Sequence, residues 1–391
     1  MTTVKNTYKL VVEKFTENEL QSIKELFDKR GNWSEATDDA KYITFIYVYY
    51  IYNEYPSKYW NIQSNIISNI KFTSPKISNK DVFYNNFKKL FPEECAKYMP
   101  LQYNINPSNY QNINKKIFDD NKYWLAKLSS GLSGIGIQMF TNWEDYYSFF
   151  QNFYNKDGDK LLNISGIPSN KWVLSYYIKN PLLIKGYKFH LRVPLVYLLE
   201  NNARGVGFVA TKSMIFTAKK PYIQDDWNNK DIHDTHFKTS YSRTLEYPAD
   251  LDFITAENIN YIDYQIYDIS RCVIEIINRT QSAVCWEGTK HCFYIIGMDI
   301  LIDTDYRARI LEINENAVIY NDNPNYKQDL VAGIIYNLVD PYFPPEHPMS
   351  DNGFFKKIGH HNTINTYDNK YKHKYQKYKQ KYFKQKKKFQ G

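Results

Sequence analysis

The stretch Gly297-Met-Asp-Ile-Leu-Ile-Asp-Thr-Asp-Tyr-Arg-Ala-Arg-Ile-Leu-Glu-Ile-Asn314 decides the fold, because it predicts two strands joined by a polar turn. Glu312 and Asn314 are two residues apart, so strand geometry places both side chains on one face. Asp299 lies near the start of the first strand and comes close to that face if the strands pair. Three oxygen-bearing side chains, two of them charged, suit Mg²⁺ with water and phosphate oxygens as its other ligands.

A surface hairpin with solvated acids is the alternative explanation of this stretch. Apolar residues surround the acids, which favours a buried strand, where an unpaired carboxylate costs several kcal/mol. We therefore take a magnesium site at Asp299, Glu312 and Asn314 as the working hypothesis. Such a site requires phosphate-binding residues elsewhere in the chain.

Length and composition predict a folded protein of two or three domains, since the chain has 391 residues, 43% of them hydrophobic, and 37 tyrosines. No apolar run reaches the roughly 18–20 residues that span a bilayer. The N-terminus lacks the apolar core of a signal peptide, so we expect an intracellular, cytoplasmic protein with no membrane partner. Cys95, Cys272, Cys285 and Cys292 show neither metal-ligand spacing nor a disulfide framework, which predicts a reducing compartment.

The basic character belongs to a tail. Residues 370–391 hold ten lysines and no acid, so the formal charge of +8 leaves about −2 for the rest. Lysines alternate with aromatic residues there, a pattern that serves nucleic-acid binding through phosphate contacts and stacking. It equally serves binding to acidic protein segments, and a solvated terminus without a partner is the third possibility.

A glycine-rich loop supplies the first phosphate-binding candidate. Tyr123-Trp-Leu-Ala-Lys127 predicts a short strand, Ser129-Ser-Gly-Leu-Ser-Gly-Ile-Gly136 a loop, and residues 137–140 a second strand. Glycines let backbone N–H groups approach phosphate oxygens closely. The loop is not a Walker motif, because no Gly-Lys-Ser/Thr follows and no helix starts there. An ordinary glycine hairpin is the alternative.

A cationic strand face supplies the second candidate. In the predicted strand 186–199, Lys188, His190 and Arg192 alternate with apolar residues and so share one face. These groups repel one another unless an anion lies between them, and ATP with its magnesium is such an anion. An exposed edge strand is the alternative. His233 and His236 are three apart, but no further ligand accompanies them, which argues against zinc.

The remaining pattern predicts a mixed α/β chain. We expect helices over 17–30, 79–98, 143–155, 260–282 and 329–339, strands over 43–52 and 171–178, a hairpin over 206–219 and a connector over 103–116. The helix over 260–282 has an apolar stripe that we expect in the core: Ile262, Ile266, Ile269, Val273, Ile276 and Ile277.

In this order, the segments resemble those of ATP-grasp enzymes, and more specifically of the tubulin–tyrosine ligase-like family. The segments that carry the resemblance are Ile77-Ser-Asn-Lys-Asp-Val-Phe-Tyr-Asn-Asn-Phe87 with Phe91-Pro92, Trp124-Leu-Ala-Lys-Leu-Ser-Ser-Gly-Leu-Ser-Gly-Ile-Gly-Ile137, Tyr177-Ile-Lys-Asn-Pro-Leu-Leu-Ile184 with Lys188-Phe-His-Leu-Arg192, Ile232-His-Asp-Thr-His236, and Tyr294-Ile-Ile-Gly-Met-Asp299 with Leu311-Glu-Ile-Asn314. They cover about residues 70 to 345. Each segment alone is weak evidence for the family, but five segments in the order found in the family are specific evidence.

The resemblance implies an α+β or α/β ATP-grasp fold, in which two α/β lobes clasp ATP behind a smaller N-terminal α/β domain. It implies an N-terminal region over 1–70, a ligase domain over 71–345 with lobes over 71–180 and 181–345, and a linker with the basic tail over 346–391. Nucleotide-binding residues would be Lys127, Ser130, Gly131, Gly134, Gly136, Ser175, Tyr176, Tyr177, Ile178, Lys188 and Asp299. The metal ligands would be Asp299, Glu312 and Asn314.

The activity that the resemblance implies is an ATP-dependent carboxylate–amine ligation, a protein modification similar to polyglutamylation. An acyl phosphate forms on a protein or peptide carboxylate, and the amine of an amino acid then attacks it. Lys188, Arg192 and Glu312 would be catalytic, while His190, Arg192 and His236 would lie near the substrate. The partners would be an amino acid and an acceptor, with an acidic tail like that of tubulin as one possibility.

Three positions depart from the family pattern. The family usually carries Asp at His190 and Asn at His236, and it has an arginine where Met214-Ile215-Phe216 offers none. We therefore expect the part of the site that binds the nucleotide to be intact and the part that binds the acceptor to be altered. The amine substrate is accordingly not expected to be tyrosine, glutamate or glycine, which the family usually takes. The alternatives are a non-catalytic ATP-binding or interaction module and a nucleic-acid binder that acts through residues 370–391.

Overall fold

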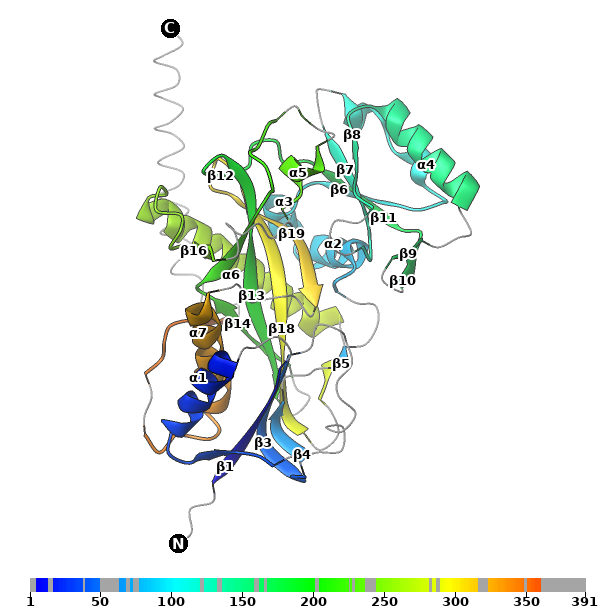
Figure 1. Ribbon diagram of the computed structural model, residues 1–391. Helices are drawn as coiled ribbons and strands as arrows, with labels where there is room; N and C mark the ends of the chain where they lie inside the picture. Colours follow the sequence, from blue (N-terminus) through cyan, green and yellow to red (C-terminus); the bar gives the residue numbers. More distant parts are fainter. Residues whose placement is uncertain are drawn as a thin grey trace.

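The computed structural model has a mixed α/β architecture (Figure 1). It describes residues 5–12, 17–37, 39–49, 63–67, 71–72, 77–119, 123–131, 136–157, 162–164, 167–200, 204–224, 226, 229–235, 244–280, 283–285, 289–315, 323–347 and 350–359. The helices are α1 (Glu17–Asp28), α2 (Lys80–Leu90), α3 (Pro92–Tyr98), η2 (Tyr110–Asn112), η3 (Lys115–Phe118), α4 (Trp143–Asp157), α5 (Lys230–His233), α6 (Ala256–Thr280), α7 (Pro324–Ile334) and the π-helix η4 (Ile335–Val339).

Strands β13 (Tyr187–Glu200) and β18 (Thr289–Ile302) form the centre of a twelve-stranded sheet. They pair antiparallel from Leu191 opposite Ile300 to Glu200 opposite His291. The other strands of this sheet are β1 (Asn6–Val12), β2 (Trp33–Glu35), β3 (Tyr42–Tyr49), β4 (Gln63–Ile67), β12 (Leu183–Ile184), β14 (Val206–Ala210), β15 (Ser213–Thr217), β16 (Glu246–Tyr247), β19 (Ala308–Glu315) and β20 (Phe355–Lys357). Two long paired strands give a rigid frame on which side chains can be placed by register.

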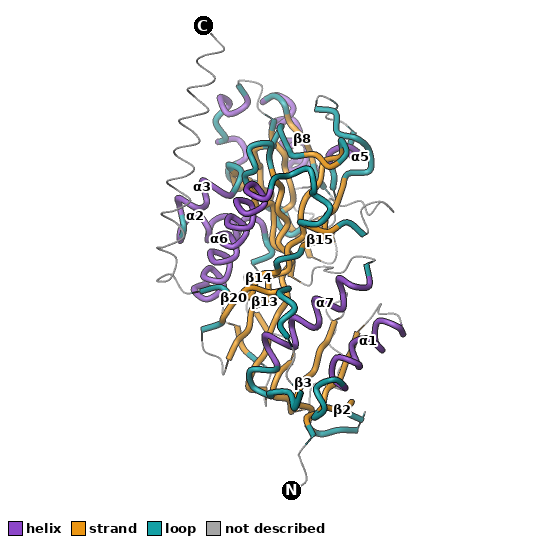
Figure 2. The backbone as a smooth tube through the Cα atoms, turned by 90° about the vertical axis from the view of Figure 1, so that its left-hand side faces the viewer, coloured by secondary structure: helices purple, strands orange, loops and turns teal. Residues whose placement is uncertain are grey.

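Helices cover both faces of this frame. Figure 2 shows α2, α3 and α6 on one side of the strands and α1 and α7 on the other. Phe189, Leu191 and Val193 of β13 pack into the core that contains α6, whereas Val196 and Leu198 pack with α1 and α7. The expected stripe of α6 is buried throughout, and each such aliphatic side chain contributes roughly 1.5–3 kcal/mol.

A smaller sheet forms a separate layer beside the central one. Its order is β6-β11-β7-β8, from β6 (Gln102–Ile105), β7 (Trp124–Leu128), β8 (Gln138–Phe140) and β11 (Trp172–Tyr176). Helix α4 packs Tyr146 and Phe150 against Trp124 and Trp172 of this sheet. The remaining short pairs are β9 (Leu162–Ile164) with β10 (Ile167–Ser169) and β5 (Lys71–Phe72) with β17 (Ala283–Val284).

The N-terminal strands continue the central sheet. Strand β4 pairs parallel to β18 with Ile66 opposite His291, and β3 and β1 follow it in parallel. Arg30, at the end of α1, forms a buried ion pair with Asp340 just after η4. The proposed boundary near residue 70 thus falls inside one sheet, and the division of the chain into domains stays a prediction.

Several expectations were wrong in detail. Residues 206–219 do not form a hairpin, because β13 is long enough to pair along one edge with both β14, at Leu195–Leu198, and β15, at Phe189–Arg192. The helix expected over 79–98 is divided at Phe91 by Pro92, and the connector over 103–116 begins as strand β6.

The expectation of no disulfide was also wrong, since Cys285 and Cys292 are joined with their Cα atoms 5.6 Å apart. The two cysteines are seven residues apart in sequence, a spacing that alone did not indicate the bond. Cys95 and Cys272 are buried free thiols. None of the described helices is long and apolar enough to cross a membrane.

Candidate active site

Three neighbouring strands bring the predicted charged residues together. Arg192 of β13 lies opposite Asp299 of β18, and Asp299 lies opposite Glu312 of β19. Asn314 is two residues beyond Glu312 and shares its face. The alternation in β13 is as predicted, because Lys188, His190 and Arg192 lie on the face away from α6. The structure thus brings these residues together on three paired strands, and their role as a magnesium site stays a prediction.

Asp299 is the buried centre of this cluster, with 1% of its surface exposed. Arg192 grips it bidentately, with Nε donating to Oδ1 and Nη2 to Oδ2, each at 2.8 Å. Asn314 Nδ2 donates to Asp299 Oδ2 at 3.0 Å and lies 3.4 Å from Glu312 Oε1. A shift in register after Asp299 breaks the regular pairing of β18 with β19 at this point. The bulge belongs to the site.

Glu312 is paired with a lysine that the sequence analysis assigned no role. Lys80 Nζ lies 3.0 Å from Glu312 Oε2 and donates to the carbonyl of Gly131 at 2.8 Å. Both charged side chains are nearly buried, with 11% and 12% exposed. Lys80 thus ties the first turn of α2 to the glycine-rich loop and to β19. Its backbone N–H donates to the carbonyl of Ser129, which fixes the same junction.

Lys188 heads a second chain of contacts. Its Nζ donates to the hydroxyl of Tyr177 at 3.0 Å, and that hydroxyl lies 2.9 Å from His233 Nδ1. The backbone carbonyl of Asp226 lies 2.9 Å from His233 Nε2. Burial and the charge of Lys127 lower the pKa of Lys188 to about 7, while Asp234 opposes the shift. Burial likewise lowers the pKa of Lys127. Two desolvated lysines beside each other are costly without an anion.

His190 is buried with 1% exposed, so it is not on the surface of the site. Its Nδ1 lies 2.6 Å from Thr235 Oγ1, its Nε2 lies 3.6 Å from Asp299 Oδ1, and its ring packs on Phe216. Arg192 stacks on the same ring of Phe216. His190 therefore supports Asp299 and Thr235 from behind, and its predicted place beside the substrate stays a prediction. His236 lies outside the described residues.

A cavity of about 310 Å³ opens beside this cluster, between the smaller sheet and the central one. The two lysines Lys127 and Lys188 line it, as does the segment Ser175–Ile178, which was predicted as the adenine-reading edge. Apolar side chains form its other walls: Pro100, Leu125, Ile137, Met139, Leu301 and Leu311. Apolar walls with a few convergent polar groups are typical of a small-molecule site.

The glycine-rich loop is described in part. Ser130 and Gly131 follow β7, and Gly136 has φ +78° with a Cβ position 3.1 Å from Leu128, so a side chain there would be strained. Gly134 lies outside the described residues. Lys80 lies in the segment 77–87, one of those that carry the family resemblance. A lysine in the first turn of a helix, where the dipole disfavours a cation, is a signal that could have flagged it.

This arrangement lies in a part of the chain that matches a protein-family model. The model of the tubulin-tyrosine ligase family matches residues 47–351, most of the chain. The chain belongs to the tubulin-tyrosine ligase family. All of the cluster, from Lys80 to Asn314, lies within the matched segment.

Curated relatives in this family are distant. The probable alpha-tubulin polyglutamylase Ttll1 of Tetrahymena thermophila is 26% identical over 343 residues, 74% of this chain and 78% of its own length. The probable tubulin–tyrosine ligase PBY1 of Saccharomyces cerevisiae is 25% identical over 57% of this chain and 32% of its own length. The probable tubulin polyglutamylase ttll-9 of Caenorhabditis elegans is 23% identical over 61% and 59%. The chain thus spans about a third to three fifths of the length of two of these relatives.

A solved structure shows the fold. The C-terminal domain of K. lactis Pby1, described as an ATP-grasp enzyme that interacts with the mRNA decapping enzyme Dcp2, matches with a TM-score of 0.63. The match covers 90% of this chain and 99% of that domain at 18% sequence identity. The chain of this tubulin-tyrosine ligase family member therefore has the expected ATP-grasp fold.

The residues present fit ATP and magnesium. Two carboxylates and an amide form the donor set, which is of the oxygen type that Mg²⁺ prefers. Among the described residues no group of three or more His, Cys, Asp and Glu side chains could hold a metal, so this mixed set is the candidate. Arg192 and Lys80 balance the two carboxylates. The lysines across the cavity suit phosphate oxygens.

Proposed function

We propose that the protein is an ATP-dependent carboxylate–amine ligase that joins an amino acid to a protein or peptide carboxylate. One observation carries the proposal. Two desolvated lysines, Lys127 and Lys188, line the same cavity as an apolar wall and adjoin two paired carboxylates, the buried Asp299 and the nearly buried Glu312. Cations for phosphates, apolar walls for a base and carboxylates for a metal are the parts that phosphoryl transfer from ATP requires.

In the proposed reaction Lys127 and Lys188 hold the phosphates of ATP, and the edge Ser175–Ile178 holds its base. A metal at Asp299, Glu312 and Asn314 would neutralise the charge of the phosphates. Desolvation strengthens each of these interactions, because charges attract more strongly where water is excluded. Tyr177 keeps Lys188 directed into the cavity through its hydrogen bond.

The transfer itself proceeds in two steps. A carboxylate oxygen of the acceptor takes the γ-phosphoryl group of ATP, which gives an acyl phosphate and ADP. The amine nitrogen then attacks the acyl carbon, expels phosphate and loses a proton, which leaves an amide. Arg192 would hold the acceptor carboxylate bidentately, for which its guanidinium would exchange the Asp299 carboxylate that it grips in this structure.

The relatives support a protein acceptor. Ttll1 of Tetrahymena thermophila and ttll-9 of Caenorhabditis elegans are both named as probable polyglutamylases of tubulin. The direct test incubates the full chain with Mg-ATP, each of the twenty amino acids in turn and an acidic acceptor peptide. We expect one amino acid to accelerate ADP release and to add its residue mass to the peptide.

A non-catalytic ATP-binding module is the second candidate, favoured by strand β15. Ile215 there is fully buried, and neither Met214 nor Phe216 offers the cation that the family pattern has at this place. ATP binding without product for any amino acid or acidic peptide would support this second candidate. The same panel of reactions therefore decides between the two.

The titration of Lys188 gives a pH prediction. The lysine is protonated below its pKa of about 7, and phosphate binding retains that proton. ATP affinity is therefore expected to be constant below this pH and to fall as pH rises, by up to about tenfold per unit. Isothermal titration with ATP between about pH 6 and pH 9 measures the slope.

The control is Lys188→Met. Protonation of ATP itself affects this variant as it affects the wild type, but the variant has no lysine at position 188 to titrate. Its affinity is expected to be lower and to fall less steeply above pH 7 than that of the wild type. Equal slopes for the two proteins would contradict the assignment of Lys188 to the phosphates.

A further inference from the structure

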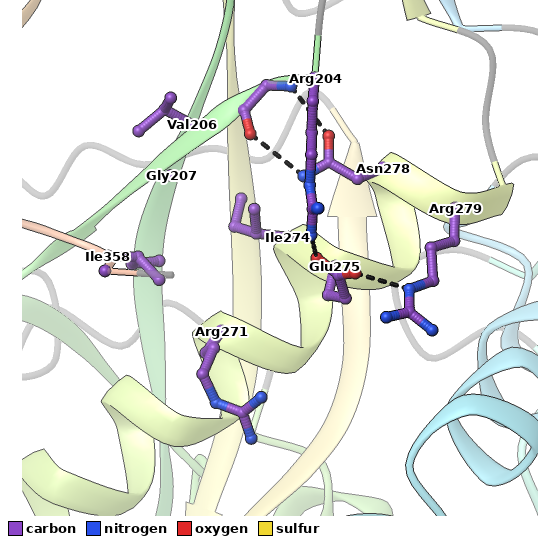
Figure 3. A pocket seen from close by; sticks show the side chains of 11 residues that line it. Arg204, Val206, Gly207, Arg271, Ile274, Glu275, Asn278, Arg279 and Ile358 are labelled. Atoms are coloured by element: carbon purple, nitrogen blue, oxygen red, sulfur yellow. Dashed lines mark hydrogen bonds and ion pairs between the residues drawn. The ribbon is translucent and has the colours of Figure 1, made fainter. Parts of the chain in front are cut away.

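A second cavity, of about 300 Å³, lies on the α6 face of the central sheet (Figure 3). It shares no lining residue with the cavity of the candidate active site. It is bounded by the C-terminal half of α6, by the segment 204–207 at the start of β14, and by Ile358 and Gly359 after β20. Lys188, His190 and Arg192, the active-site residues of β13, lie on the other face of the central sheet, away from α6. This cavity therefore needs an explanation of its own.

Arginines dominate the charge of this cavity. Arg271, Glu275 and Arg279 recur every four residues along α6 and so line one face of the helix. Arg204, from the segment before β14, and Arg279 both form ion pairs with Glu275 (Figure 3). Burial alone would raise the pKa of Glu275, but the two arginines lower it, so this carboxylate is ionised.

One carboxylate cannot satisfy two guanidinium groups. Each guanidinium carries five N–H donors, and Glu275 accepts only a few of the ten. The side chains of Arg204 and Arg279 both line the cavity and are each 56% exposed, so part of each guanidinium is accessible to solvent. The site therefore has spare donors in the geometry that binds carboxylates in pairs.

The walls of the cavity are already ordered. Asn278 accepts from the backbone N–H of Gly205 and donates to its carbonyl, at 2.9 and 3.1 Å, which fixes the segment that carries Arg204. Gly207 packs so closely that a Cβ there would lie 2.4 Å from Ile274. Ile274 and Ile358 provide an apolar floor. Little ordering is needed before a ligand binds.

A lysine-rich stretch of sequence follows the last residue that lines this cavity. Gly359 lines it, and the chain continues from there into residues 360–391, which hold ten lysines and one acid, Asp368. A cluster of like charges attracts an oppositely charged chain over distances of about a Debye length, ~10 Å at moderate salt. The sequence that follows the cavity is thus strongly basic, which favours an acidic partner.

We propose that this cavity, which we call the arginine pocket, docks an acidic segment of a partner polypeptide through a glutamate or aspartate side chain. The carboxylate would bridge Arg204 and Arg279 beside Glu275, and its methylene groups would rest on Ile274 and Ile358. None of the described lining residues is aromatic, so the pocket lacks the stacking platform that single-stranded nucleic acids use.

The test measures binding of a fluorescein-labelled oligoglutamate peptide to the full chain by anisotropy, without ATP. The double variant Arg204→Gln with Arg279→Gln is expected to weaken binding about tenfold, since two partly exposed charged pairs are lost. Glu275→Gln is expected to strengthen binding, because the arginines no longer share a carboxylate. If these residues served only in packing, the arginine double and Glu275→Gln would not change peptide affinity in opposite directions.

The control double variant is Lys24→Gln with Lys115→Gln, which removes the same charge from two other ion-paired cations, at 2.8 and 2.7 Å from their carboxylates. It is expected to bind like the wild type. The proposal is overturned if the peptide fails to bind, if both doubles weaken binding equally, or if labelled oligouridylate binds more tightly and loses affinity in the arginine double. The proposed ligase activity is measured separately and does not depend on this result.

Discussion

Glu312→Gln is expected to lower the rate of ADP release by about 10²–10³-fold at saturating Mg-ATP, acceptor and amino acid. The substitution keeps the shape of the side chain and removes the charge that faces Lys80 at 3.0 Å. A glutamine oxygen carries no formal charge, so the site would hold a divalent cation more weakly and balance less of the charge of the transferred phosphoryl group. Lys188 and the cavity walls keep their contacts, and Lys127 loses only its attraction to the charge of Glu312, so ATP affinity is expected to change less than the rate.

The matched control is Glu144→Gln, which also removes the carboxylate from a glutamate–lysine pair, here with Lys115 at 2.7 Å. Glu144 is exposed and lies on α4, so its loss is expected to leave ADP release unchanged. Thermal unfolding of both variants checks that the fold is kept. If Glu312→Gln turns over ATP at the wild-type rate, the assignment of the metal site is wrong.

The central residues of the candidate site could be predicted from the sequence because they are close together along the chain. Asp299 and Glu312 are joined by one short turn, and period-two alternation fixes which side chains face each other once the strands pair. The same alternation in β13 placed Lys188 and Arg192 without any knowledge of their neighbours. Short-range periodicity thus sufficed for the charged face of three strands.

Contacts between segments that are distant in the sequence could not be predicted in this way. Lys80 meets Glu312 only because α2 packs beside β19, and no pattern within α2 states that distance. The burial of His190 depends on Thr235 and Phe216, which come from two other segments. The pairing of both β14 and β15 with β13 likewise depends on the length of β13. Each miss concerns tertiary packing, which sequence periodicity does not encode.

Arg30→Met is expected to lower the free energy of unfolding by about 3 kcal/mol, because it leaves a nearly buried carboxylate without its partner. Arg30 is 2% exposed and donates to both oxygens of Asp340, each at 2.9 Å, and to the carbonyl of Leu26. These contacts join the end of α1 to the segment after η4, across most of the length of the chain. Urea denaturation followed by circular dichroism measures the loss.

Two comparisons make this prediction specific. Lys24→Met breaks an exposed pair between Lys24 of α1 and Glu35 of β2 and is expected to cost at most about 1 kcal/mol. The double variant Arg30→Met with Asp340→Leu is expected to regain most of the loss, because no charge is left buried. Equal losses for Arg30→Met and Lys24→Met would contradict the prediction.

The shape of the denaturation curve carries a further consequence. Strands β1, β3 and β4 share one sheet with β18, so loss of the Arg30–Asp340 pair is expected to weaken a single cooperative transition. Separate transitions for Arg30→Met, with the helical signal of α1 lost first, would instead indicate that residues 1–70 unfold as a domain of their own. The boundary near residue 70 is thereby tested by the same measurement that tests the ion pair.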